Sequence, residues 1–477
     1  MLSQVSAKGN KKMRKTTFEN FSYGLAGRLL SQALSFVLMI YLARTLGPAD
    51  FGSLNFAIAI VGYFSILATL GLQVEGVRIT AREQQAPVKS VNLIFSLRIY
   101  LAICAYFLLL LYAYLCFFHT DLRFFYLIAL YGLGLFSSAF LLDWYFVGNE
   151  ELQTLTSATV LGSLVGSSMT LWVVNSVEEV LFIPVLSFLG SAIACIYLLF
   201  RYLQRYQINL VFDFELFRQL LIVSLPFAAS TIINQIQANL DMVLLGYFWT
   251  AAEVGYYSVA YRIVIVFSGL VGVYSQSTFS AMIRLNETDK SGAMTYLKKN
   301  LHVMLYIMIP VITGGTILAN SIILTFFGDK YQESVLPFIL LLYYLLLMTL
   351  SISMANFLLS IKSDKAYIQI LVCGVIVNSV TNFLLIPHWK AVGAAAAMAI
   401  TELATLLFLL SRVRIFLPSG WLDGQFIASS IAGAAVMGGL CYWVQSSFNF
   451  HVVFTILLGI ITYFGLTGFY CMNYLKR

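Results

Sequence analysis

Three arginines stand inside segments that are otherwise apolar enough to cross a bilayer: Arg28, Arg98 and Arg262. A guanidinium at bilayer depth costs about 2.5–3.5 kcal/mol on insertion scales, so it persists where helices enclose it or water reaches it. The planar, permanently charged guanidinium suits bidentate contact with a phosphate. The sequence therefore predicts that these arginines line a pathway for an anion. The alternative is that each is neutralised by a buried acid or caps backbone carbonyls between helices.

Three acidic residues complement the arginines inside apolar segments: Asp143, Asp241 and Glu402. A carboxyl group at this depth can bind a proton or a cation, and such a site couples transport to an ion gradient. The same groups can instead be static charge partners of the arginines. Both interpretations, ion coupling and charge pairing, stay open at this stage.

Outside these segments the sequence offers little that performs chemistry. Glu75 and Arg78 have the i, i+3 spacing of a helical ion pair at a cytoplasmic edge, which favours a surface pair, with a cytoplasmic gate as the alternative. The six cysteines and four histidines are scattered without metal-ligand spacing. No Walker-type phosphate loop is present, and no predicted loop exceeds about 20 residues. We therefore expect no catalytic residues, no metal, no cofactor and no enzymatic activity.

The elements that must position these residues are membrane-spanning helices. The chain is 60% hydrophobic and 10% charged, whereas soluble proteins are about 25% charged. Runs of about 20 apolar residues, enough to cross ~30 Å of hydrocarbon as a helix, recur along the whole sequence. This pattern predicts an all-α polytopic membrane protein with about fourteen transmembrane helices. The predicted spans are 20–43, 51–72, 91–117, 124–147, 153–174, 180–200, 220–245, 253–278, 300–327, 335–360, 367–386, 392–411, 426–444 and 452–473.

The basic residues predict the orientation of these spans, because Lys and Arg accumulate on the cytoplasmic side. With fourteen spans and a cytoplasmic N-terminus, 21 of the 28 Lys and Arg residues fall inside and 4 fall outside. Both termini are therefore expected in the cytoplasm. This asymmetry explains the net charge of +7 through contact with anionic lipid headgroups and without nucleic acid.

The chain repeats itself weakly at an offset of 203 residues. This offset places Asp50 on Glu253 and Gly52 on Gly255, and it superposes the first two spans on the seventh and eighth. An even number of spans separates the copies, so the repeats are parallel and predict two pseudo-symmetric lobes. The expected divisions are a basic cytoplasmic segment 1–19, an N-lobe 20–200, a linker 201–219 with a candidate amphipathic helix, a C-lobe 220–411, a cytoplasmic loop 412–425, two extra spans in 426–473, and a cytoplasmic end 474–477.

Three segments resemble a known family: LGPADFGSLNFA at 46–57, TLGL at 69–72 followed by Arg78, and VGYYSVAYRI at 254–263. They are similar to the polysaccharide-transporter branch of the multidrug/oligosaccharidyl-lipid/polysaccharide exporter superfamily. The resemblance implies two six-helix lobes around a cavity that opens alternately to each side. It also implies an undecaprenyl-pyrophosphate-linked oligosaccharide as cargo. Such cargo is flipped outward across a bacterial inner membrane for O-antigen, lipopolysaccharide, capsule or exopolysaccharide assembly.

Three other functions compete with this flippase. Two belong to the same superfamily: a flippase for lipid II, the peptidoglycan precursor, and a multidrug or cation antiporter, whose cavities are usually lined by acids. The third is a polysaccharide polymerase or ligase, which usually needs a large outer loop that this sequence lacks. For the leading function, the expected partners are the lipid-linked oligosaccharide and membrane lipids, with polymerase and chain-length proteins as further candidates. We expect a monomer.

Overall fold

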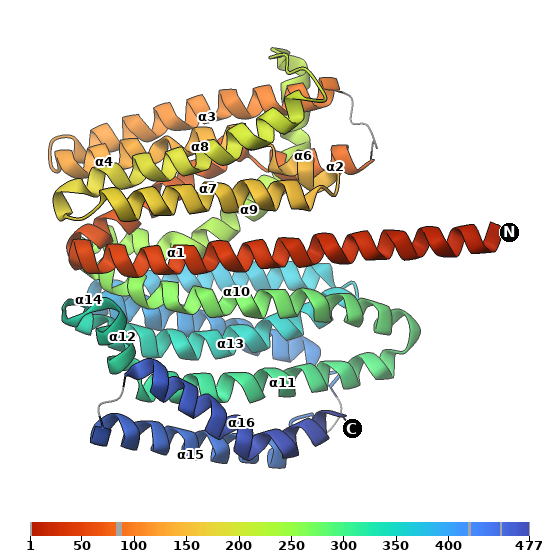
Figure 1. The fold of residues 1–477 in the computed structure, drawn as a ribbon, viewed down its shortest axis with the longest axis vertical. Helices are drawn as coiled ribbons and strands as arrows, with labels where there is room; N and C mark the ends of the chain where they lie inside the picture. Colours follow the sequence, from red (N-terminus) through yellow and green to blue (C-terminus); the bar gives the residue numbers. More distant parts are fainter. Residues whose placement is uncertain (1, 83–87, 418–420, 449–450, 477) are drawn as a thin grey trace. The chain divides into compact units, whose positions relative to one another are not determined.

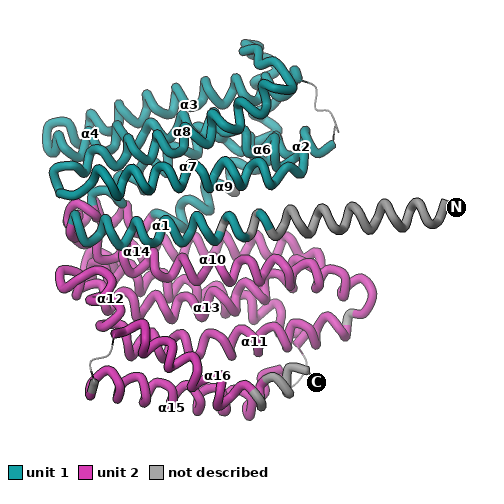
Figure 2. The backbone as a smooth tube through the Cα atoms, viewed as in Figure 1, with its two compact units in different colours: residues 1–46, 53–239 teal, residues 47–52, 240–477 magenta. Residues whose placement is uncertain are grey.

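The computed structural model describes residues 2–82, 88–417, 421–448 and 451–476, and within these ranges it contains helices and no β-strand. The side chains of most residues before Leu29, that of Arg28 among them, lie outside the described part. The chain forms two compact units (Figure 2). Unit 1 comprises Met1–Leu46 and Ser53–Asn239, and unit 2 comprises Gly47–Gly52 and Leu240–Arg477.

Unit 1 is a bundle in which α3, α4, α7 and α8 lie side by side (Figure 1). Its core includes Trp144, Phe95 and Leu198, which come from α6, α3 and α8. Its elements are α1 (Leu2–Thr69), α2 (Leu72–Arg82), α3 (Val88–Phe117), α4 (Leu122–Gly132), α5 (Gly134–Phe140), α6 (Asp143–Gly148), α7 (Leu152–Val173), η1 (Val177–Leu181), α8 (Phe182–Leu203) and most of α9 (Phe214–Phe248).

Unit 2 is built around α13, which packs against α10, α11 and α14. The two extra helices of the prediction are α15 and α16, which pack on each other and on α11. Tyr463 Oη fixes this contact by donating to the carbonyl of Tyr306, at 2.9 Å. The elements of unit 2 are α10 (Ala251–Thr288), α11 (Lys290–Ile317), α12 (Ala319–Phe327), η2 (Asp329–Ser334), α13 (Val335–Ser360), α14 (Asp364–Val413), α15 (Gly424–Phe448) and α16 (Val452–Lys476).

Two of the helices each cover two predicted spans. α1 loses helical geometry at Gly47, where φ is 74° and Pro48 follows, and α14 does so at Lys390, where φ is 52°. Glycine reaches positive φ without steric cost, and proline supplies no N–H to the helix before it. Among the described residues nine helices are long and apolar enough to span a membrane, or ten if the bent α9 is included. The multispanning all-α class is confirmed, and the count of fourteen stays a prediction.

Two segments differ from a simple spanning helix. The predicted fourth span consists of three short helices, α4, α5 and α6, with Leu141 in an extended conformation between the last two. The candidate amphipathic helix of the linker forms the first turns of α9 instead of a separate element. Phe217 enters the core of unit 1 there, while Phe214 is exposed.

The repeated turns pack on each other inside unit 2. A Cβ atom on Gly52 would lie 1.7 Å from the carbonyl oxygen of Ala251, and one on Gly255 would lie 2.1 Å from that of Pro48. Pro48 and Ala251 are separated by the same 203 residues as the two glycines. The contact is therefore reciprocal, as a repeat with this offset predicts.

Candidate functional site

Arg98 is buried in unit 1 beside the break in the predicted fourth span, which leaves carbonyl groups without helical partners. The last carbonyls of a helix have no intrahelical donor, and burying them without one is costly. Arg98 Nη2 donates to the carbonyl of Ser138, and Nη1 donates to that of Leu141 at 3.2 Å. The Arg98 side chain thereby supplies hydrogen-bond donors to carbonyl groups at the end of α5. This side chain is almost completely buried.

Asp143 opens α6 on the other side of the same break. Its Oδ1 lies 3.7 Å from Arg98 Nη1, too far for a direct hydrogen bond, so the pairing is electrostatic. Its Oδ2 accepts a hydrogen bond of 2.7 Å from Gln73 Nε2 on α2. Two of the intramembrane charges predicted from the sequence thus meet, as the charge-pairing interpretation expects.

Unit 2 contains a buried carboxylate whose partners are neutral. Asp241, near the end of α9, is fully buried. Tyr257 Oη donates to its Oδ2 at 2.7 Å, and Asn382 Nδ2 donates to its Oδ1. These donors come from α10 and α14, so Asp241 joins three helices. None of the ion pairs among the described residues involves Asp241.

More polar groups lie on α14 close to Asp241. Asn378 and Asn382 are one helical turn apart, and the amide oxygen of each is buried without a hydrogen-bond partner among the described atoms. Thr401 Oγ1 lies 3.5 Å from Thr381 Oγ1 between the two halves of α14. Buried oxygens without donors can accept a hydrogen bond from a protonated group or coordinate a small cation. This arrangement is compatible with the ion-coupling interpretation of Asp241.

The other predicted residues lie on α10, α14 and α2. Arg262 is half-buried on α10, directly after Tyr261, whose ring stacks on that of Tyr257 with 5.6 Å between the ring centres. Glu402 is half-buried on α14, directly after Thr401. Glu75 and Arg78 form an ion pair of 3.3 Å on α2, and the Arg78 guanidinium lies 5.6 Å from the centre of the Phe227 ring.

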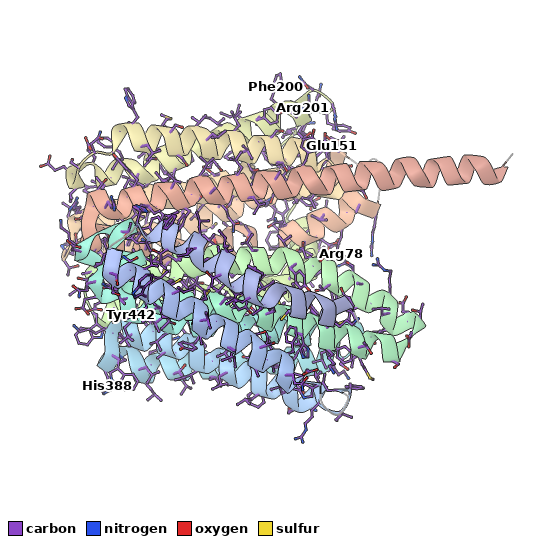
Figure 3. The ribbon with its side chains drawn as sticks, turned by 60° about the horizontal axis from the view of Figure 1, so that its bottom comes forward. Arg78, Glu151, Phe200, Arg201, His388 and Tyr442 are labelled. Carbon is purple, nitrogen blue, oxygen red and sulfur yellow. The ribbon has the colours of Figure 1, made fainter. Side chains whose placement is uncertain are left out.

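Three charged residues of unit 1 lie toward the same end of it in Figure 3: Arg78 on α2, Arg201 on α8, and Glu151 directly before α7. Glu151 also accepts a hydrogen bond from Arg205, which raises the pKa of that guanidinium. Their common location fits the predicted orientation of the spans.

Comparison with known proteins identifies the family of this chain. The family model described as "Polysaccharide biosynthesis protein" matches residues 17–286, more than half of the chain. The chain belongs to this family. It is 21% identical over 411 residues to the capsular polysaccharide biosynthesis protein CapF of Staphylococcus aureus, covering 82% of this chain and 97% of that one. It is 25% identical to a putative O-antigen transporter of Shigella dysenteriae, covering 60% and 71%.

The fold agrees with solved transporter structures. The lipid II flippase MurJ in an inward closed conformation superposes with a TM-score of 0.73 at 15% identity, covering 95% of this chain and 99% of that one. An inward-facing multidrug resistance transporter of the MATE family and the MOP superfamily superposes with a TM-score of 0.62 at 14% identity, covering 81% and 95%. The predicted resemblance is confirmed, and the chain has a multispanning transporter fold.

Sequence reasoning missed the neutral partners of Asp241. Tyr257 and Asn382 are common residues, and neither carries a charge that contrasts with an apolar span. A signal was available, because Asn378 and Asn382 lie four residues apart in an apolar segment. That spacing places two amides on one helix face, where they need polar partners.

Proposed function

We propose that this protein transfers undecaprenyl-pyrophosphate-linked oligosaccharide units from the cytoplasmic to the outer leaflet of the inner membrane by alternating access. One observation carries the proposal: the family match is accompanied by relatives that are named for capsular polysaccharide biosynthesis and O-antigen transport. A third relative, of Haloferax volcanii, is named a probable flippase and is 26% identical over 47% of this chain and 48% of its own. Both chain ends are cytoplasmic in this proposal, and polymerase and chain-length proteins are candidate partners.

Arg28 and Arg262 are the proposed contacts of the pyrophosphate. Each is a permanent cation in an apolar span, and a pyrophosphate offers several oxygens to a guanidinium fork. Arg98 already donates to two carbonyl groups and lies beside Asp143. Arg98 therefore contacts cargo only if the pair with Asp143 separates during transport.

Replacing both proposed contacts tests this function. In cells that lack their own flippase, the double variant Arg28→Gln, Arg262→Gln is expected to lose most surface polysaccharide while its protein level stays normal. Arg218→Gln is the matched control, because Arg218 is an exposed arginine outside the predicted spans. Full export by the double variant would contradict the assignment of the two arginines.

The coupling site in this proposal is Asp241, with Glu402 as a further candidate. The buried amide oxygens near Asp241 support this choice, because they would complete the shell around a proton-bearing group or a sodium ion. Export into vesicles that is unaffected when both the proton and the sodium gradient are collapsed would contradict coupling. It would leave the flippase function itself standing.

The lipid II alternative calls for a separate measurement. The superposition with MurJ establishes the fold alone, because the two chains share 15% of their residues. We expect that this protein will not sustain growth of cells depleted of their lipid II flippase. Sustained growth would place lipid II among its cargoes.

A further inference from the structure

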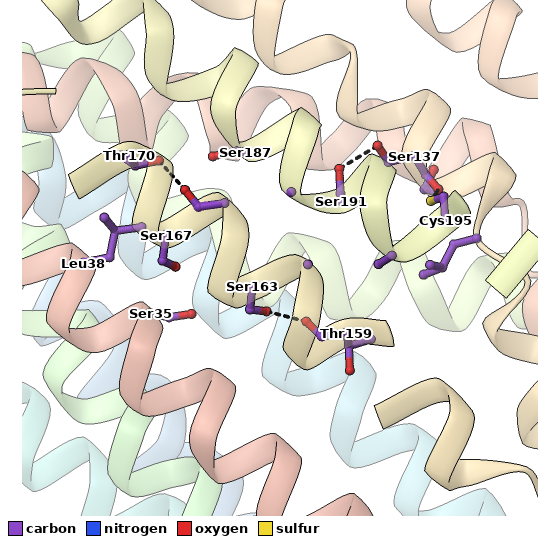
Figure 4. A pocket seen from close by; sticks show the side chains of 16 residues that line it. Ser35, Leu38, Ser137, Thr159, Ser163, Ser167, Thr170, Ser187, Ser191 and Cys195 are labelled. Carbon is purple, nitrogen blue, oxygen red and sulfur yellow. Dashed lines mark hydrogen bonds between the residues drawn. The ribbon is translucent and has the colours of Figure 1, made fainter. Parts of the chain in front are cut away.

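A cavity of about 350 Å³ lies within unit 1 between α1, α5, α7 and α8 (Figure 4). Hydroxyl groups dominate its polar lining, and Asp, Glu, Lys and Arg are absent from the described residues around it. The hydroxyls that carry the argument belong to Ser35, Ser138, Thr159, Ser163, Ser167 and Thr170. The cavity is separate from the Asp241 cluster, which belongs to unit 2.

Close helix contacts create this space. α7 and α8 touch through their backbones, since a Cβ atom on Gly162 would lie 2.5 Å from the carbonyl oxygen of Gly190. α1 closes another side and is fixed to α7 at two levels. Gly27 packs against Thr156 at one level, and Tyr41 Oη donates to the carbonyl of Val174 at 2.9 Å at the other. The cavity occupies the interval between these contacts, where the side chains are small.

The hydroxyls face the cavity mainly as hydrogen-bond acceptors. Thr159 donates its proton to the carbonyl of Thr156, Ser163 to that of Thr159, and Thr170 to that of Gly166. Ser138 on α5 likewise donates to the carbonyl of Leu135. Because these four protons are used within their own helices, the lone pairs of the four oxygens are left for a ligand. The cavity therefore suits a ligand that carries several O–H or N–H donors.

Charge and size narrow the chemical class of this ligand. A pyrophosphate needs cations or N–H donors, and the described lining offers no charged side chain. Glycine backbone and Leu38 add apolar surface, which suits the C–H face of a sugar ring. The volume is near the lower limit of about 300 Å³ for small-molecule sites, enough for about one monosaccharide.

We propose that this cavity is a carbohydrate subsite that binds a neutral sugar ring of the cargo. The inference rests on the proposed flippase function and adds the place where the glycan is recognised. The pyrophosphate and the sugar are then bound by different groups: guanidinium groups bind the anion, and hydroxyl oxygens of α7 bind the sugar.

Binding of two lipids that differ only in the sugar tests the subsite. The probes are undecaprenyl pyrophosphate and the same lipid carrying one N-acetylglucosamine, and the purified full chain is held in nanodiscs. We expect the wild type to bind the glycosylated lipid more tightly. The variant Thr159→Val, Ser163→Ala, Ser167→Ala should lose roughly tenfold or more of its affinity for that lipid, because three acceptors are removed. Its affinity for the bare lipid should not change.

The control is Ser168→Ala, which removes a neighbouring hydroxyl of α7 that does not line the cavity. Thermal unfolding verifies that each variant is folded, and the near-isosteric Thr159→Val is measured alone in case the triple variant is unstable. An unchanged preference for the glycosylated lipid in folded variants would overturn the subsite. So would an equal loss for both lipids, which is the result expected if a lipid chain occupies the cavity. A wild-type protein that binds neither lipid would overturn the flippase function as well.

Discussion

The two units each hold a carboxylate among their helices, but they surround it differently. In unit 1, the Asp143 side chain is 17% exposed and lies beside the buried guanidinium of Arg98. In unit 2, Asp241 is bound by the neutral side chains of Tyr257 and Asn382. A buried charge pair is expensive to break, whereas an acid with neutral donors can change its charge without leaving a cation unpaired. The comparison supports a structural role for the first acid and is compatible with the ion-coupling role that we propose for the second.

The internal repeat does not include the charged residues of these two centres. The offset of 203 residues takes Arg98 to Leu301, Asp143 to Leu346 and Asp241 back to Leu38. Each of these three charged residues therefore has a leucine as its counterpart in the repeat, so neither charged centre is repeated.

The largest effect is expected from breaking the pair in unit 1. Arg98→Met removes the cation beside the partly exposed Asp143 and the donors of two buried carbonyls, so it should destabilise the protein by about 3–5 kcal/mol. Thermal unfolding of the purified protein measures this loss. The double variant Arg98→Met, Asp143→Asn should recover part of the stability. Wild-type stability of the single variant would contradict a structural role for the pair.

A smaller effect is expected from removing one donor in unit 2. Tyr257→Phe deletes the hydroxyl that donates to Asp241 and should cost about 1.5–3 kcal/mol, the usual value for a hydrogen bond to a charged group. Tyr256→Phe is the matched control one residue away. Equal unfolding temperatures for the two variants would show that the Asp241 hydrogen bond contributes nothing.

Asp241→Asn should alter stability by less, within about 1 kcal/mol, because a neutral amide of the same size removes the cost of a buried charge. Its main effect should be on transport. Export by the wild type is expected to respond to an imposed proton or sodium gradient, and export by the variant should be insensitive to both. Asp143→Asn, tested in parallel, should lower stability instead. If the two substitutions behaved alike, the difference between the units would be refuted.

The smallest effect is expected at the ion pair on α2. Glu75→Gln should change stability by less than about 1 kcal/mol, because Arg78 is half-exposed and water screens the pair. If the unfolding temperature of Glu75→Gln is unchanged, its rate of export distinguishes a surface ion pair from a cytoplasmic gate. A strong fall in export would support a cytoplasmic gate, and unchanged export would leave a surface pair.

The sequence was sufficient to predict the fold class, because apolar runs of spanning length are read one segment at a time. It also drew attention to Arg98, Asp143 and Asp241, since a charge in an apolar run is conspicuous. Their partners could not be predicted in the same way. Whether Arg98 meets Asp143 depends on where the fourth span breaks. The break lies at Leu141, and this residue is neither a glycine nor a proline that would have predicted it.

The cavity of unit 1 was missed for a related reason. Serine and threonine are frequent in membrane helices, where they usually hydrogen-bond to their own backbone. Their clustering appears only when α7 packs against α8 through Gly162 and Gly190. Such packing brings together residues from several segments, and these contacts cannot be predicted directly from a single sequence.

The reciprocal contact of the two repeated turns limits how this protein can evolve. Gly52 meets the backbone of Ala251, and Gly255 meets the backbone of Pro48, so the atoms that exclude a larger residue are main-chain atoms. Backbone atoms cannot be trimmed by mutation. A deleterious substitution at either glycine should therefore have no suppressor that acts by shortening a facing side chain, and reversion to glycine should dominate among recovered revertants.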